Sequence, residues 1–94
     1  MGKAIWKFKL KIDDKQSIEM PKGAQILSAQ VQHNILCIWA LVDVDAEKEQ
    51  RTFEIFGTGN PVPDYVDAEH NYKFIATFMY YDGGFVGHLF EPYK

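Results

Sequence analysis

The stretch Trp6-Lys7-Phe8-Lys9-Leu10-Lys11-Ile12 alternates apolar and lysine side chains without interruption. A β-strand sends successive side chains to opposite faces, so this segment would present one fully apolar face and one face of lysines. A row of lysines is typical of a strand at the edge of a sheet, where charge prevents pairing with another chain. The alternative is a surface that tracks an acidic partner or a nucleic-acid backbone. We expect an edge strand.

Two longer runs follow, at residues 24–32 and 35–44, with His33-Asn34 between them. Asparagine tolerates the left-handed conformation that a tight hairpin turn requires. Residues 35–42 are apolar on both faces, which favours a central strand buried on both sides. For the first run a helix is the alternative, because some of its apolar residues are helically spaced.

The second half of the chain continues the pattern around two loops. The expected strands lie at 51–56, 72–81 and 85–90, and Asp82-Gly83-Gly84 between the last two is the strongest hairpin signal in the sequence. Residues 43–50 are polar and acidic and read as a loop. Residues 58–71 form a long connection with two prolines, and loops of this length are uncommon in compact domains and often functional.

Six or seven strands with short turns and no convincing long helix predict an all-β fold, either an antiparallel sandwich or a small, partly open barrel. The 94 residues, with 47% hydrophobic and 24% charged side chains, are expected to form one domain over residues 1–94. We expect Trp39 and Phe78 to be sealed in its interior. Residues 35–42 and 72–81 form two runs that are apolar on both faces. They are consistent with a homodimer, because a chain of this size has little material to cover both faces.

Charge and cysteine content limit the partners and the compartment. Six lysines oppose three acids in residues 1–42, and four basic groups oppose ten acids in residues 43–94, for a net charge of −3. This distribution argues against binding of duplex nucleic acid, which needs a concentrated basic footprint. No segment approaches the length of a membrane span, and the N-terminus lacks the features of a signal peptide. We expect a cytoplasmic protein without a membrane partner.

Catalytic signatures are sparse. Neither Ser17 nor Ser28 lies in a nucleophile elbow, and Cys37 lies in the most apolar run, where burial disfavours the reactive thiolate. The three histidines are His33, His70 and His88, and we expect His88 to be a half-buried strand residue. No two of them have the spacing of metal ligands. We expect neither an enzyme nor a bound metal or cofactor.

One acidic cluster has the spacing of a calcium loop. Its members are Asp43, Asp45, Glu47, Glu49 and Glu54. The sharp turn of such a loop needs glycine at its sixth position, which is Lys48 here. We therefore interpret residues 43–50 as a solvated acidic hairpin loop.

Several stretches together resemble a family of small proteins of tailed bacteriophages and prophages. They are Ile18-Glu19-Met20-Pro21-Lys22-Gly23-Ala24, the run from Cys37 to Asp43, Gly57-Thr58-Gly59-Asn60-Pro61, and the closing segment from Gly84 to Glu91. That family has no assigned function and no catalytic or binding residues to carry over. Asn60 stands where a histidine is expected, which argues against metal binding by this loop. The resemblance implies an accessory protein that acts by binding.

We therefore expect a non-enzymatic accessory protein whose partner is a host or phage protein. The function that we favour is binding and inhibition of a host protein or defence complex. Recognition residues collect on loops held by a rigid sheet. The candidate contacts are Tyr65 and Asp67 in the long connection, with Asp45 and Glu47 in the acidic loop.

Two alternatives remain open. An oligomeric sponge would sequester a small nucleotide signal through converging cations, for which the candidates are Lys9, Arg51 and Lys73. A minor structural protein of the virion is the other alternative.

Overall fold

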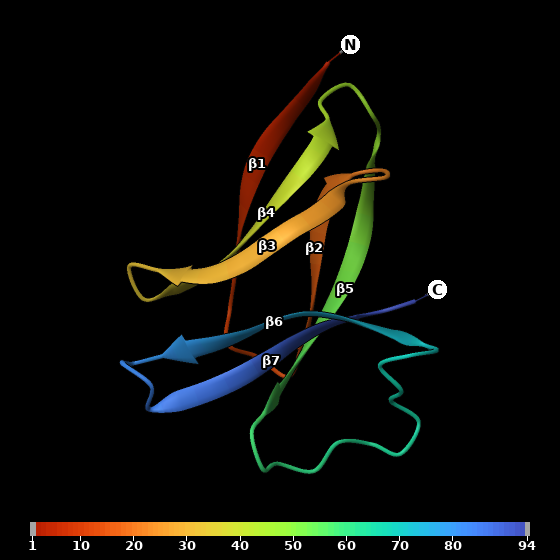
Figure 1. Ribbon diagram of the computed structural model, residues 1–94. Helices are drawn as coiled ribbons and strands as arrows, with labels where there is room; N and C mark the ends of the chain where they lie inside the picture. The colour runs from red at the N-terminus through yellow and green to blue at the C-terminus, as the bar shows by residue number, and fades with distance from the viewer. Residues whose placement is uncertain (1, 94) are drawn as a thin grey trace.

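Two antiparallel sheets make up the fold in the computed structural model, which describes residues 2–93 (Figure 1). The strands are β1 (Lys3–Leu10), β2 (Lys15–Pro21), β3 (Gln25–Gln32), β4 (Ile35–Asp43), β5 (Lys48–Gly57), β6 (Tyr72–Tyr80) and β7 (Phe85–Pro92). Sheet A has the order β1-β4-β3 and sheet B the order β2-β5-β7-β6. The predicted all-β fold is confirmed, and of the two expected architectures the sandwich-like one is observed, since the sheets do not close into a barrel.

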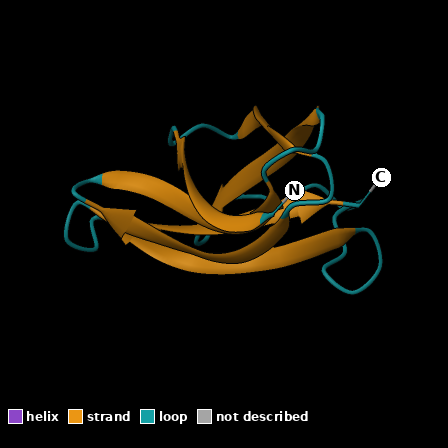
Figure 2. Ribbon diagram, turned by 90° about the horizontal axis from the view of Figure 1, so that it is seen from above, coloured by secondary structure: helices purple, strands orange, loops and turns teal. Residues whose placement is uncertain are grey.

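The hydrophobic core lies between the two sheets, which curve as layers when viewed from above (Figure 2). Each strand contributes alternate side chains to it because the strand period is two. The largest fully buried side chains include Met20, Leu36, Ile38, Phe53 and Leu89. Burial of these apolar groups supplies the main favourable term for folding. Residues 2–93 contain no helix that is long and apolar enough to cross a bilayer.

Strand β1 is an edge strand, as its lysines predicted, because it pairs only with β4. Trp6, Phe8 and Leu10 pack against the core, while the lysines and Ile5 face outward. Lys7 Nζ donates a hydrogen bond of 3.0 Å to Gln32 Oε1 on β3, so its side chain reaches across β4. Cys37, whose two cross-strand neighbours are Lys9 and Gln30, is 1% exposed on this outer face.

Strand β4 is the centre of sheet A, as predicted, but the expectation that Trp39 is sealed in the interior is wrong. Ile38 and Ala40 face the core, so the alternation places Trp39 on the outer face, where it is only half-buried. A two-layer sandwich has one interior, and no third layer lies over this face among the described residues. Phe78 on β6 is buried, as expected.

Strand β6, although apolar on both faces, is buried on only one of them. It lies at the edge of sheet B, and a bulge between Phe74 and Ala76 interrupts its alternation. Phe74 is 48% and Met79 65% exposed, because none of the described residues covers their part of the outer face of sheet B. Residues 25–32 form a strand rather than the alternative helix.

The acidic loop is shorter than expected. Strand β4 extends to Asp43 and β5 begins at Lys48, so only residues 44–47 connect them. The polar residues at the start of β5 pair through their main chain with β2, where Met20 opposes Glu49. Polar side chains do not prevent such pairing when one face of the strand is solvated.

The β3–β4 and β6–β7 turns lie beside each other at one end of the molecule (Figure 1) and line a shared hollow of about 380 Å³. His33 and Asn34 have φ angles of 52° and 63°, and positive φ at both central residues is the requirement of a type I′ hairpin turn. The left-handed conformation also occurs at Tyr81 and Asp82 in the second turn.

Replacing the first turn by the preferred pair, His33→Asn with Asn34→Gly, is expected to stabilise the protein by about 1 kcal/mol, because it removes left-handed strain. For a domain of this size that raises the thermal midpoint by about 4–8 °C, measured by circular dichroism. The control, Asn34→Ala, should lower the midpoint. A lower midpoint for the Asn-Gly variant would contradict the turn assignment.

Candidate functional site

Four aromatic rings meet on the outer face of sheet B, and we call them the aromatic cluster: Phe56, Tyr72, Phe74 and Phe90. Phe90 on β7 is its centre, with ring centroids 5.7 Å from Phe56, 6.4 Å from Tyr72 and 5.4 Å from Phe74, all edge to face. Such pairs contribute about 0.5–1.5 kcal/mol each beyond the area that they bury. The cluster therefore has a defined geometry although Phe74 is half in solvent.

A carboxylate lies buried at the border of this cluster. Glu54 on β5 is 9% exposed, and the Tyr72 hydroxyl donates a 2.9 Å hydrogen bond to its Oε2. Burial, followed by the hydrogen bond and the negative charge of Glu54, raises the pKa of Tyr72 to about 12. Among residues 2–93 no cation lies within ion-pair distance of this carboxylate.

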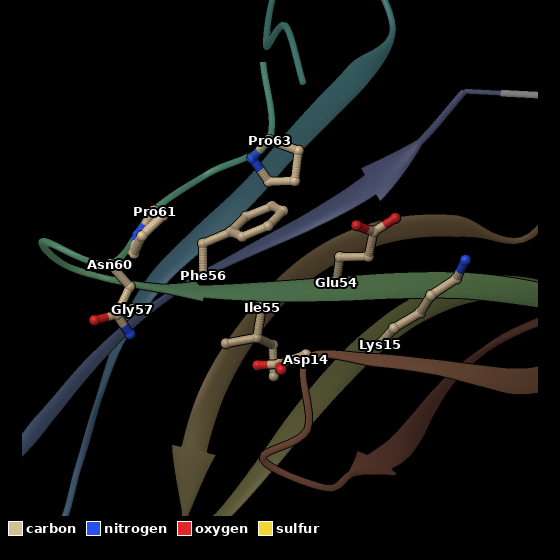
Figure 3. A pocket seen from close by; sticks show the side chains of 9 residues that line it. All are labelled: Asp14, Lys15, Glu54, Ile55, Phe56, Gly57, Asn60, Pro61 and Pro63. Carbon is tan, nitrogen blue, oxygen red and sulfur yellow. The ribbon is translucent and has the colours of Figure 1, made fainter. Parts of the chain in front are cut away.

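A hollow of about 460 Å³ opens beside Glu54 (Figure 3). The side chains of Glu54 and Phe56 project from β5 to the same side, because they are two residues apart in a strand. Pro63, from the long connection, lies above the Phe56 ring, and Lys15 of the neighbouring strand β2 lines the same hollow. The hollow thus combines a carboxylate, an aromatic ring and proline walls.

The long connection, residues 58–71, is ordered by Asp67. Its main-chain carbonyl accepts hydrogen bonds from the N–H groups of His70, Asn71 and Tyr72, at 3.0–3.2 Å. Its carboxylate accepts from the Glu69 N–H at 2.9 Å and meets His70 Nδ1 at 2.7 Å. These contacts, with the Glu69 N–H contributing most, lower the pKa of Asp67 below its usual range.

The structure does not bring the four predicted contact residues together. Asp45 and Glu47 lie in the turn before β5, whereas Tyr65 and Asp67 lie in the loop after it (Figure 1). β5 has ten residues, which corresponds to a length of roughly 33 Å. Tyr65 is 66% exposed, while the Asp67 carboxylate is engaged inside its own loop.

Two of the three predicted ligand cations do meet. Arg51 and Lys73 line a second hollow of about 500 Å³, whereas Lys9 lies on the outer face of sheet A. The Arg51 guanidinium is engaged by both oxygens of Glu91, with Nη2 to Oε1 at 3.0 Å, and Nη1 donates to the Ala24 carbonyl at 2.8 Å. The hydrogen bonding of its guanidinium to the Glu91 carboxylate is the main cause that raises the pKa of Arg51.

His88 is a half-buried strand residue, as predicted, and both of its ring nitrogens have hydroxyl partners. Thr58 Oγ1 lies 2.7 Å from Nε2, and Thr77 Oγ1 lies 2.9 Å from Nδ1. These two contacts fix the orientation of the ring. Within residues 2–93 no group of three or more His, Cys, Asp or Glu side chains is arranged to hold a metal ion.

Sequence reasoning missed the pairing of Glu54 with Tyr72 and the cluster beside it. One local signal was available: Glu54 is the only acid in the otherwise apolar run from Phe53 to Phe56. Its partner lies 18 residues further along the chain, so the pairing depends on the order of strands in sheet B.

Comparison with known families shows which family the chain belongs to. The family described as a domain of unknown function (DUF7352) matches residues 1–94. The chain belongs to the DUF7352 family. The expected resemblance to a family without an assigned function is confirmed by this match. Neither a search of curated proteins nor a search of solved structures finds a match for this DUF7352 chain.

The phenol of Tyr72 should ionise at about pH 12 in an ultraviolet titration of the folded protein. Because its pKa is raised on folding, the stabilisation that it contributes is present below pH 10 and is lost as the pH rises toward 12. Tyr72→Phe should remove this step, and Glu54→Gln should lower its pKa by removing the negative charge. Tyr65→Phe is the control and should leave the step in place. A step that survives Tyr72→Phe would contradict the assignment.

Asp67→Ala should loosen the long connection without unfolding the sheets. We expect faster amide hydrogen exchange at residues 69–72, measured by NMR, while global stability changes by less than about 0.5 kcal/mol, as is usual for surface substitutions. In the wild type the same protection should persist above the usual pKa of an aspartate and disappear as the pH falls through the lowered pKa of Asp67. Asp64→Ala, an exposed acid of the same loop, should leave the exchange unchanged, and equal effects of both variants would disprove the role of Asp67.

Proposed function

We propose that this DUF7352 protein is a non-enzymatic binding protein that recognises another protein through the aromatic cluster and the adjoining long connection. The observation that carries the proposal is the exposure of Phe74, which is 48% accessible although its ring is held edge to face against Phe90. Exposed aromatic rings with fixed geometry are the side chains that most often dominate the binding energy of protein interfaces.

The long connection supports the proposal because its internal hydrogen bonds order it before any partner arrives. Asn71 donates to the Tyr65 carbonyl and accepts from the Asp67 N–H, which fixes the main chain beside the exposed Tyr65 ring. A preorganised loop loses less conformational entropy on binding than a mobile one. Tyr65 would then contact the partner at the border of the interface.

The biological setting is a further part of the proposal. An accessory protein of phage type, acting in the host cytoplasm, would bind and inhibit a host protein or defence complex. This part is supported by the sequence resemblance alone and is an inference from context rather than from a site.

A nucleotide sponge is a second candidate, favoured by the shared hollow of Arg51 and Lys73. Lys22 adds a third cation there, whereas Glu49 and Glu91 add two acids and Glu91 already neutralises Arg51. Mass spectrometry of the purified protein for a co-purifying nucleotide separates this candidate from protein binding.

The test compares Phe74→Ser with Met79→Ser, two exposed apolar residues of the same strand β6. Each tagged variant is used for affinity capture from expressing cells, and the interaction is then repeated with the purified partner by calorimetry and light scattering. Phe74→Ser should weaken the complex about tenfold or more, as expected when an interface anchor is lost. Met79→Ser should retain wild-type affinity. The absence of any partner, or equal affinity for both variants, would refute the proposal.

A further inference from the structure

The Glu54 carboxylate has one oxygen that remains free for a ligand. Oε2 accepts from Tyr72, and no described residue donates to Oε1. Within residues 2–93 no buried side-chain oxygen is left without a partner, so Oε1 must be reachable from outside. A carboxylate in this position is poorly solvated, and a bound cation would compensate for the water that it has lost.

The walls of the hollow suit a flat cation. The Phe56 ring stands beside the carboxylate on the same side of β5, and Pro63 lies above it (Figure 3). A guanidinium group is planar, stacks on aromatic faces and donates paired hydrogen bonds to carboxylates, whereas an ammonium group acts as a point charge. The geometry therefore favours arginine over lysine.

The charges around the hollow have the complementary sign. The long connection carries three acids, Asp64, Asp67 and Glu69, and its residues 58–71 include no lysine or arginine. Lys15 is the basic residue that lines the hollow, and it forms no ion pair with Glu54. The acids outnumber this one base, and a net negative surface steers cationic groups toward it.

We infer that the hollow beside Glu54 receives an arginine side chain of the partner protein, with Phe56 stacking on the guanidinium. The assignment of this arginine to a partner protein rests on the proposed function. The binding of a cation in the hollow is argued from the hollow itself and does not depend on that function. A metal ion is a weaker fit, because the side chain of Asp14, the second acid of the hollow, lies on the opposite side of β5 from Glu54.

The probe is N-acetyl-arginine amide, titrated into isotopically labelled protein and followed by NMR. N-acetyl-citrulline amide, which has nearly the same shape without the charge, is the matched ligand control. We expect saturable shifts at residues 54–57 and 60–63 with the arginine probe, in the millimolar range that a single side chain allows, and at least tenfold weaker binding of citrulline.

Variants make the test specific to the carboxylate. Glu54→Gln should weaken binding of the arginine probe at least tenfold, while Glu19→Gln, an exposed acid of β2, should not change it. Lys15→Ala should strengthen binding about twofold to threefold by removing the competing cation, an opposite effect that a merely structural role of this region would not produce. Phe56→Leu should weaken binding about threefold, and it keeps the test decisive if Glu54→Gln does not fold.

Equal binding of the two probes, shifts elsewhere on the surface, or indifference to Glu54→Gln would overturn the inference. Its failure can be told apart from failure of the proposed function. If Phe74→Ser abolishes partner capture while the arginine probe does not bind, only the inference falls. If the probe binds at Glu54 but no partner is captured, the protein-binding proposal falls and the cation site remains.

Discussion

The Arg51 guanidinium connects β5 to β7 and to the start of β3, at a position where the main chains of β5 and β7 are not paired. β5 pairs with β7 only over residues 54–57, and before that point the Arg51–Glu91 ion pair connects the two strands. Nη1 of the same guanidinium donates to the Ala24 carbonyl and so connects sheet B to the start of β3. β5 pairs with β2 over residues 48–54 and with β7 over residues 54–57. Glu54 stands at this change of partner, opposite Lys15 on one side and Phe90 on the other.

Alternation in the sequence predicted the strands better than it predicted their burial. The lysine row of β1 identified an edge, and the His33-Asn34 pair identified a hairpin, because both signals are local. Trp39 was misjudged because apolar residues on both faces of a strand were interpreted as burial on both faces. This chain of 94 residues builds two layers with one core between them, so the outer-face side chains of each strand lie outside that core whatever their composition.

The candidate site was less accessible to sequence reasoning. Loop length directed attention to residues 58–71, but it could not show that the Asp67 carboxylate is used within the loop. The Glu54–Tyr72 hydrogen bond and the rings around Phe90 depend on which strands become neighbours in sheet B. Strand order is a long-range property, and side chains from β5, β6 and β7 carry no mutual signal in the linear sequence.

The position of Cys37 gives the protein a natural reporter. Its thiol donates to the Ile35 carbonyl and is 1% exposed on the outer face of sheet A, between its cross-strand neighbours Lys9 and Gln30. An alkylating reagent can reach the sulfur only after these neighbours move aside. The rate of alkylation of the native protein therefore measures how often sheet A opens around β4, without any label being introduced.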